Sequence, residues 1–395
     1  MNDSPEEYLH KISQIAISSR CSDVQVVATD EHILQELDCL KEAIEYSKEY
    51  PLGDNLLSTL ASFSSDIVGK PFENEDIKEF PRTDNCSNKW VGYASCCHSD
   101  EVLVVKAFPV NDVKVCNFLR ELSATELLNS LELKRARVVK ILGAGKTVLS
   151  EKGLMLFAES FAEGTSVLEI VRSVIQDESV IEKAQRVVNK VGLALGELHN
   201  KNSGKTGRMP RYRLERICIN YAINQKRSSE IVSQIDWFKM AQHYEKTLEN
   251  AETLEFVYGY QHGEAHMESF LYNDSSDTLT IIDVPQVHFS VDDVGEPMGV
   301  PAYDFVRFEE HLSSIQGEGL RKEVFKLLKD SFREGYTSTA KALPDRELRE
   351  LFKLPLKMWG LGTFFDWEQT GNSQEKLYNS FMFHSSLEYF EGLLT

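Results

Sequence analysis

The chain has 395 residues, a formal net charge of −19 and an apolar content of 42%. This length is enough for two or three packed layers or lobes, each with its own core. The acidic charge would repel nucleic acid and anionic membranes, so we expect neither as a partner. No run of about 18 uninterrupted apolar residues occurs, so we expect no membrane span.

The acidic charge is concentrated near the N-terminus. Residues 1–80 hold 6 Lys and Arg against 17 Asp and Glu, and the remaining 315 residues carry only −8. Such charge mainly keeps a protein in solution, and it also tolerates a cationic small molecule or a basic protein partner. The N-terminus lacks the apolar segment of a secretory signal, and the seven cysteines have no regular spacing. We therefore expect free thiols and a cytoplasmic location.

Hydrophobic periodicity divides the chain into three expected regions. Residues 1–80 have apolar positions at helical spacing and predict an acidic helical N-terminal extension. Residues 81–162 predict two strands, a helix and two more strands, which indicates an antiparallel sheet carrying one helix. Residues 163–395 are mostly helical, with two short strands at 269–272 and 279–283. The predicted fold class is α+β, with a sheet-rich small lobe before a mainly helical large lobe.

The four strands of the small lobe are expected at 89–94, 101–108, 137–142 and 153–158, the last two on either side of a glycine-rich turn. That turn contains Ala144-Gly145-Lys146-Thr147, which resembles the end of a P-loop. A P-loop would need a glycine at the position of Lys140 and a helix after the run, so we exclude a P-loop here.

Lys106 ends the apolar run Val102-Leu103-Val104-Val105. A lysine in such a run must be paired or must face a cleft, although a lone lysine at a strand end is more often a solvated charge. Glu121 follows 15 residues later, on the predicted helix. This separation suits an ion pair between a strand lysine and a helix glutamate, and Glu126 is a second candidate partner.

A second group of polar residues lies in the large lobe. The run His262-Gly263-Glu264-Ala265-His266-Met267-Glu268-Ser269-Phe270-Leu271 precedes a hairpin-like segment, which leads to Leu279-Thr280-Ile281-Ile282-Asp283. Asp283 stands at the mouth of an apolar strand, 19 residues after Glu264. These segments resemble the catalytic loop and metal-binding strand of the aminoglycoside phosphotransferase/choline kinase-like family, which has a two-lobed protein-kinase-like fold.

The resemblance implies a role for each matching position. The family loop is His-Gly-Asp-x-His-x-x-Asn, so Glu264 replaces the aspartate that acts as catalytic base, and its carboxylate lies one methylene farther out. Ser269 replaces the asparagine that binds metal, and methylthioribose kinases are similar in having serine there. Asp283 matches the catalytic aspartate that binds Mg²⁺, although Pro285 replaces the glycine or acidic residue usual after it.

Other matches point to structural support. His262 and His266 would brace the loop through hydrogen bonds. The run Gly299-Val300-Pro301-Ala302-Tyr303-Asp304-Phe305 resembles the segment that follows the metal strand in these kinases. There the aspartate ties the loop to the next helix, which implies this role for Asp304. His199, at the end of a predicted helix, is expected to pack in the core.

The resemblance implies an ATP- and Mg²⁺-dependent kinase that phosphorylates a hydroxyl of a small molecule. Lys106, fixed by Glu121, would bind the nucleotide phosphates. The sequence does not identify the acceptor.

Three alternatives remain open. The changes at Glu264 and Ser269 suit a pseudokinase that binds or scaffolds without catalysis. A kinase-fold enzyme that acts on a protein, or transfers another group, could use residues 1–80 to recruit a basic partner. His262, Glu264 and His266 could instead form a three-ligand metal site.

Overall fold

The structure is a computed structural model that describes residues 56–80, 90–95, 102–109, 121, 124–149, 152–201, 204–209, 232, 235–284, 287, 290, 297–369 and 373–394. The chain forms two compact units. Unit 1 comprises Met1–Glu132, Arg137–Glu163 and Thr280–Glu296, and unit 2 comprises Leu133–Ala136, Gly164–Leu279 and Pro297–Thr395. Most of the helical extension expected over residues 1–80, and Pro285, lie outside the described residues.

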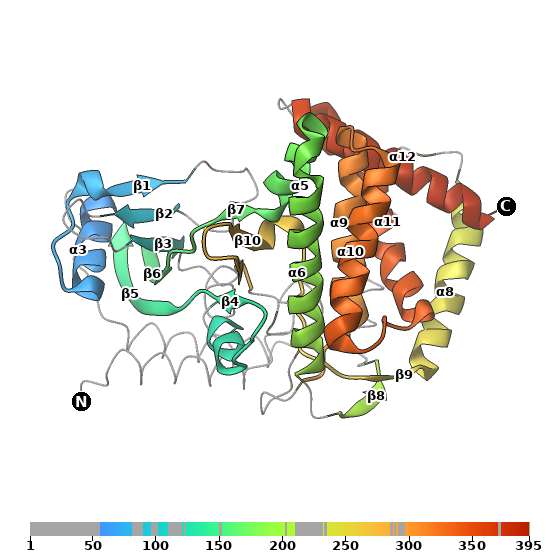
Figure 1. Cartoon of the computed structure of the whole chain (residues 1–395), viewed down its shortest axis with the longest axis horizontal. Coiled ribbons are helices and arrows are strands. Elements are labelled where there is room, and N and C mark those ends of the chain that lie inside the picture. Colours follow the sequence, from blue (N-terminus) through green and yellow to red (C-terminus); the bar gives the residue numbers. More distant parts are fainter. Residues whose placement is uncertain are drawn as a thin grey trace. The chain divides into compact units, whose positions relative to one another are not determined.

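Unit 1 is built on a five-stranded antiparallel sheet with the strand order β1-β2-β3-β6-β5 (Figure 1). The strands are β1 (Ile77–Glu79), β2 (Trp90–Ser95), β3 (Val102–Pro109), β5 (Ile141–Leu149) and β6 (Lys152–Ser160). Positions along β2 alternate between buried and half-buried, the pattern of a strand with one face on the core. The predicted antiparallel sheet is therefore present, and β1 adds an edge strand to it.

Helix α3 (Leu56–Val68) packs on this sheet. Its Leu60 and Phe63 are fully buried in one cluster with Trp90 of β2, Val105 of β3 and Leu156 of β6. Burying large apolar side chains of this kind stabilises the fold by roughly 1.5–3 kcal/mol each. Residues 56–80 thus contribute a covering helix and an edge strand to the same hydrophobic core.

The glycine-rich stretch at 143–145 forms part of a strand, so the prediction of a turn there was wrong. Residues Ile141–Leu149 make up β5, and Gly143 faces α3. A Cβ at Gly143 would lie 1.9 Å from Ile67 Cδ1, so a side chain there would displace the Ile67 side chain of α3. The glycine therefore permits close packing of helix on strand. The strand also confirms that Ala144–Thr147 is no P-loop.

Within unit 1, one contact joins the helical residues 124–130 to the segment before β5, and another joins that segment to the strand before Asp283. The helix residues described here are 121 and 124–130, and Asn129 Nδ2 donates to the Val139 carbonyl at 2.8 Å. Strand β4 (Arg137–Val138) pairs in parallel with β11 (Thr278–Ile281) through Thr280 and Ile281. Asp283 lies two residues after the end of β11, so this pairing restrains the backbone that carries it.

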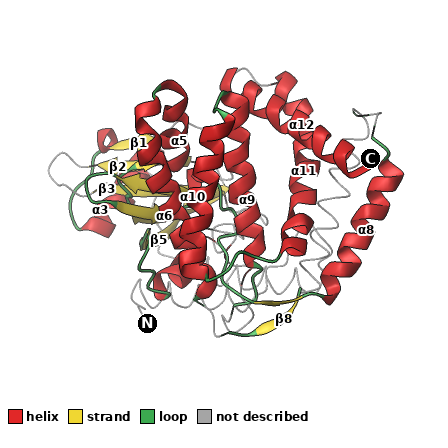
Figure 2. Ribbon diagram, turned by 45° about the vertical axis from the view of Figure 1, so that its right-hand side comes forward, coloured by secondary structure: helices red, strands yellow, loops and turns green. Residues whose placement is uncertain are grey.

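Unit 2 is mainly helical (Figure 2). Its helices are α5 (Val167–Gln176), α6 (Ile181–Asn200), α8 (Trp237–Thr253), α9 (Pro301–Ser314), α10 (Lys322–Ala340), α11 (Arg346–Gln369) and α12 (Ser373–Leu394). Short strands accompany them: β7 (Thr165–Ser166) pairs with β10 (Phe270–Asn273), and β8 (Thr206–Arg208) pairs with β9 (Glu255–Val257). Together the two units confirm the predicted α+β class. No described helix combines the length and apolarity that a membrane span requires.

Helices α6 and α10 lie side by side, as both ribbon views show (Figures 1 and 2). Glycines allow their backbones to approach closely. A Cβ at Gly192 of α6 would lie 2.2 Å from the Phe332 carbonyl oxygen, and one at Gly335 of α10 would lie 2.1 Å from the Asn189 carbonyl oxygen. Both neighbours are backbone atoms, so the helices would have to move apart to admit a side chain.

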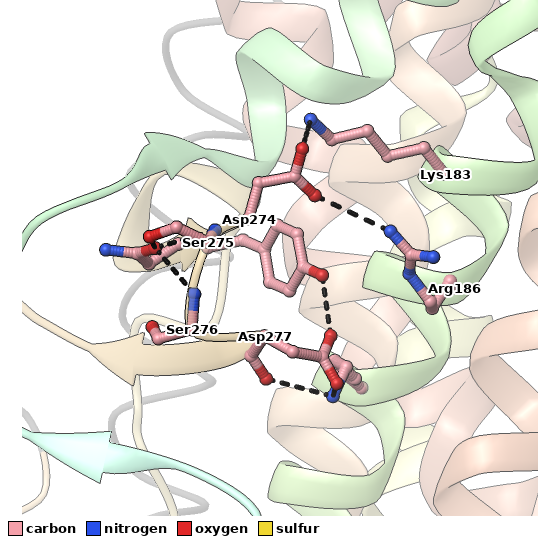
Figure 3. A network of polar contacts seen from close by, with 9 residues as sticks. Lys183, Arg186, Asp274, Ser275, Ser276 and Asp277 are labelled. Atoms are coloured by element: carbon pink, nitrogen blue, oxygen red, sulfur yellow. Dashed lines mark hydrogen bonds and ion pairs between the residues drawn. The ribbon is translucent and has the colours of Figure 1, made fainter.

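The turn that follows β10 is attached to α6 by a polar network (Figure 3). Asp274 pairs with Lys183 at 2.9 Å, and Asp277 pairs with Lys190 at 3.0 Å. The Tyr272 hydroxyl donates to Asp277 Oδ1 at 2.6 Å, which joins the strand to its own turn. These exposed ion pairs are individually weak. Their joint effect is to fix the position of the turn on α6.

Substituting Gly335 tests the close helix packing. We expect Gly335→Ala to lower the free energy of unfolding by about 1–3 kcal/mol, because overpacking outweighs the gain in helix propensity. Gly392 of α12 is the matched control, since a Cβ there meets nothing within 4 Å. Gly392→Ala should be neutral or stabilising by up to about 1 kcal/mol. Urea denaturation measures both, and equal effects of the two substitutions would contradict this account.

Candidate active site

In unit 1, the buried Lys106 of β3 is held by two glutamates. It lies opposite Phe157 of β6, and Glu159 is two residues farther on, so alternation along the strand puts all three side chains on one face. Lys106 Nζ lies 3.0 Å from Glu159 Oε1 and also contacts Glu121 Oε1. Of the two candidate helix partners, Glu121 thus supplies the ion pair, and Glu159 is a second partner.

This cluster contains more negative than positive charge. Burial alone would lower the pKa of Lys106, but the charges of Glu121, Glu159 and Asp283 outweigh it and raise the pKa. Burial raises the pKa of Glu121, and the charges of Glu159 and Asp283 act in the same direction. One ammonium group is therefore surrounded by three carboxyl groups. Such a cluster favours the approach of a further cation.

Asp283 has a left-handed backbone conformation, with φ of 56°. Among residues other than glycine, Asp and Asn adopt this conformation most readily. Its side chain is exposed, while Val284 beside it is buried and anchors the segment. The backbone thus presents a carboxylate to solvent at the edge of the buried cluster around Lys106.

The described carboxylates do not form a metal site made of protein ligands alone, but Asp283 could bind Mg²⁺ together with substrate phosphates. Among the residues that the structure describes, no group of three or more His, Cys, Asp or Glu side chains is placed to hold a metal ion. The three-ligand site considered for His262, Glu264 and His266 is therefore wrong. Mg²⁺ is usually bound through one or two carboxylates together with substrate phosphates. Asp283 can supply such an oxygen ligand.

In unit 2, Asp304 of α9 fixes the turn at the start of the candidate catalytic loop. Its carboxylate accepts hydrogen bonds from the backbone N–H groups of His262 and of Gly263, the latter at 2.7 Å. Gly263 has φ of 82°, a conformation that favours glycine. Asp304 is fully buried in the first turn of α9, where a negative charge also interacts well with the helix dipole.

A third donor reaches Asp304 from α6. His199 Nε2 lies 3.1 Å from Asp304 Oδ2, and His199 Nδ1 lies 2.8 Å from the Tyr336 hydroxyl of α10. Burial raises the pKa of Tyr336, with the charge of Asp304 adding to it, so the hydroxyl stays protonated and can donate to Nδ1. The Nε2 side of the ring faces the Asp304 carboxylate and can donate to it. The chain Tyr336–His199–Asp304 connects three helices to the loop.

The hydrogen bonds to Asp304 also set its ionisation. Burial alone would raise its pKa, but the hydrogen bond and charge of His199, with the Gly263 N–H, lower it below the ordinary 3.8. A group with a lowered folded pKa stabilises the protein above its unfolded pKa and loses that effect as the pH falls. The contribution of Asp304 is therefore present above about pH 4 and is lost in more acidic solution.

The remaining loop residues bond mainly to one another. Ser269 is fully buried, and its Oγ donates to the Glu264 carbonyl at 2.9 Å and contacts His266 Nδ1 at 3.1 Å. The backbone N–H of Glu264 donates to His262 Nδ1 at 3.2 Å. In this arrangement, the Ser269 hydroxyl forms its hydrogen bonds with other residues of the loop. Both histidines contribute to its internal hydrogen bonding.

Helix α9 reaches the loop through two more side chains. Arg307 Nη2 contacts Glu264 Oε2, and both side chains are about one quarter exposed. The backbone N–H of Met267 donates to His311 Nδ1 at 2.9 Å. Burial, with the charges of His266 and Arg307, lowers the pKa of His311 well below its ordinary value. His311 therefore remains neutral, and its Nδ1 remains an acceptor.

The structure groups the predicted residues by unit. Lys106, Glu121 and Asp283 lie in unit 1, and the predicted residues of the loop, with Asp304, lie in unit 2. Sequence reasoning missed Glu159 and Arg307. A charge at the end of the apolar run 154–158 could have indicated Glu159, because Lys106 was found in the same way. Nothing in the sequence indicated that Arg307 contacts Glu264.

Asp304→Asn tests the buried carboxylate. The amide retains the shape but replaces an acceptor oxygen and removes the charge, so we expect a loss on the order of 3 kcal/mol in the free energy of unfolding at pH 7. Below about pH 4 the difference between variant and wild type should shrink, because protonation removes the same charge from the wild type. Urea denaturation from pH 7 to pH 3 measures this. A difference independent of pH would contradict the assignment.

Comparison with known proteins finds similar solved structures but no similar sequence. No model of a known protein family matches the chain, and no curated protein sequence matches it. Among solved structures, the chain is similar to a glucosamine kinase in complex with glucosamine, ADP and inorganic phosphate, with 11% identity over 82% of this chain and 81% of that one and a TM-score of 0.49. It is also similar to aminoglycoside 2′-phosphotransferase-IIIa in its GDP complex, with 12% identity over 84% and 97% of the two chains and a TM-score of 0.46.

Proposed function

We propose that the protein is an ATP- and Mg²⁺-dependent phosphotransferase that transfers the γ-phosphoryl group to a hydroxyl of a small molecule. The observation that carries this proposal is the cluster around Lys106. Lys106 is buried within strand β3 between two glutamates, and the exposed carboxylate of Asp283 helps to raise its pKa. Phosphoryl transfer needs a fixed cation for the nucleotide phosphates and a carboxylate for the metal. Lys106 and Asp283 supply these two groups.

The division of work follows from the chemistry of each group. Lys106, held by Glu121 and Glu159, would bind nucleotide phosphate oxygens. Asp283 would hold Mg²⁺, which when bound neutralises charge that develops on the transferred group. Glu264 would accept the proton of the acceptor hydroxyl. Ser269 was expected as a second metal ligand, but its bonds to the Glu264 carbonyl and to His266 favour a role in holding the loop.

The direct test is ATP turnover in the presence of Mg²⁺ and panels of sugars, polyols and amino alcohols, followed by release of ADP. Asp283→Asn is the informative variant, because Asn tolerates the same positive φ but carries no charge. We expect at least a ~100-fold loss of turnover, since the carboxylate interacts with charge formed in the transition state. No turnover by the wild type with any acceptor, or full turnover by Asp283→Asn, would refute the proposal.

Nucleotide binding tests the role of Lys106 separately. Lys106→Met keeps the apolar stem and removes the charge, so we expect the Kd for ATP to rise by about tenfold or more. Lys140→Met is the control, because the Lys140 side chain is exposed, and its backbone N–H and carbonyl bond to Ser160 Oγ and to the Ser160 N–H, both at 2.8 Å. Calorimetric titration compares the three proteins. Equal affinities for Lys106→Met and wild type would argue against a nucleotide at this lysine.

The second candidate is a pseudokinase that binds nucleotide without turnover. It is favoured by the engagement of the Ser269 hydroxyl inside the loop and by the contact of Glu264 with Arg307. Thermal-shift titration with ATP separates the two candidates when it is combined with the turnover assay. Binding without turnover supports the pseudokinase, whereas turnover that Glu264→Gln abolishes eliminates it.

A further inference from the structure

The Glu264 side chain is directed by a partner that the loop itself does not supply. Glu264 Oε2 contacts Arg307 Nη2, and Arg307 Nη1 lies 3.3 Å from the Tyr303 hydroxyl. Tyr303 is one helical turn earlier on α9, so the arginine is supported by its own helix. The Tyr303 ring in turn packs edge-on against Phe352 of α11, with ring centroids 5.4 Å apart. The guanidinium thus belongs to a packed assembly.

The same helix also fixes the backbone beneath Glu264. Asp304 lies three residues before Arg307 and accepts the N–H groups of His262 and Gly263. His311, one turn after Arg307, accepts the N–H of Met267 on the other side of Glu264. Three side chains of α9, spaced at three and four residues, therefore hold the loop before, at and after Glu264. This spacing places them along one face of the helix.

A glutamate has one more rotatable bond than an aspartate, so its carboxylate needs more restraint to occupy one position. Arg307 provides this restraint at the carboxylate end of the side chain. An arginine suits the task because its planar guanidinium directs its N–H groups in fixed directions. Because both groups are partly exposed, the pair contributes little to stability. Its effect is therefore expected on the position of the carboxylate.

We propose that Arg307 is a positioning residue for Glu264: it holds the carboxylate end of the longer side chain where the acceptor hydroxyl can give up its proton. This inference rests on the proposed phosphotransferase function. Arg307 acts through Glu264 and takes no part in the proton transfer. It follows that removing Arg307 from a protein that already lacks the base should have no further effect on turnover.

The test is a double-mutant cycle with Arg307→Ala, Glu264→Gln and the double variant. We expect Arg307→Ala to lower kcat by ~10- to 100-fold, the effect of moving a catalytic group by about 1 Å, with KM for ATP nearly unchanged. The double variant should be no slower than Glu264→Gln alone. Guanidinium ion added at millimolar concentration should partly restore Arg307→Ala and should leave the double variant unchanged.

Arg333→Ala is the matched control. Arg333 pairs with Glu309 of α9, is about one third exposed, and lies in the same unit, but it does not touch the loop in any contact that the structure describes. Its removal should leave kcat close to the wild-type value. If Arg333→Ala reduces kcat as much as Arg307→Ala, the effect is one of general stability and the proposal fails. It also fails if the losses of Arg307→Ala and Glu264→Gln multiply, or if Arg307→Ala speeds turnover, which would mean that Arg307 masks the base.

A readout without turnover separates this proposal from the proposed function. Carbodiimide-promoted amine labelling of Glu264, followed by peptide mass spectrometry, reports how accessible the carboxylate is. We expect labelling to increase in Arg307→Ala and to stay at the wild-type level in Arg333→Ala. Unchanged labelling in Arg307→Ala refutes the positioning by Arg307 whether or not the enzyme is active. Increased labelling in a protein without any ATP turnover would support the contact and refute the phosphotransferase.

Discussion

The buried carboxylate of Asp304 is the interaction on which unit 2 depends. A charge without solvent costs several kcal/mol unless donors surround it, and here the donors come from two different elements. Two are backbone N–H groups of the loop, at His262 and Gly263, and one is the ring of His199 on α6. Because the carboxylate accepts from all of them at once, it restricts how the loop, α6 and α9 can be arranged.

The helix packing makes this arrangement possible. Gly192 and Gly335 let α6 and α10 approach until backbone atoms are almost in contact, which brings Tyr336 to His199. His199 then bridges the Tyr336 hydroxyl and the Asp304 carboxylate through its two ring nitrogens. Close packing at these two glycines thus helps to align Tyr336, His199 and Asp304, and through Asp304 it helps to position the candidate catalytic loop.

The charged clusters of the two units differ in their balance of negative and positive groups. In unit 1, one lysine is surrounded by Glu121, Glu159 and Asp283, and this surplus of carboxyl groups favours a bound cation. In unit 2, the charge of Glu264 is matched by Arg307 within the protein. An excess of negative charge suits the binding of a cation, whereas a matched pair suits the positioning of one side chain.

The sequence by itself determined the elements and the positions that repeat along them. Continuous apolar runs predicted the strands that carry Lys106 and precede Asp283, and helical spacing predicted the helix that ends at His199, because these patterns depend only on neighbouring residues. Tertiary structure alone decided which charges meet. Glu159 reaches Lys106 through strand register, and Arg307 reaches Glu264 through the packing of α9. Such contacts join residues far apart in the chain, and no local pattern encodes the distance between them.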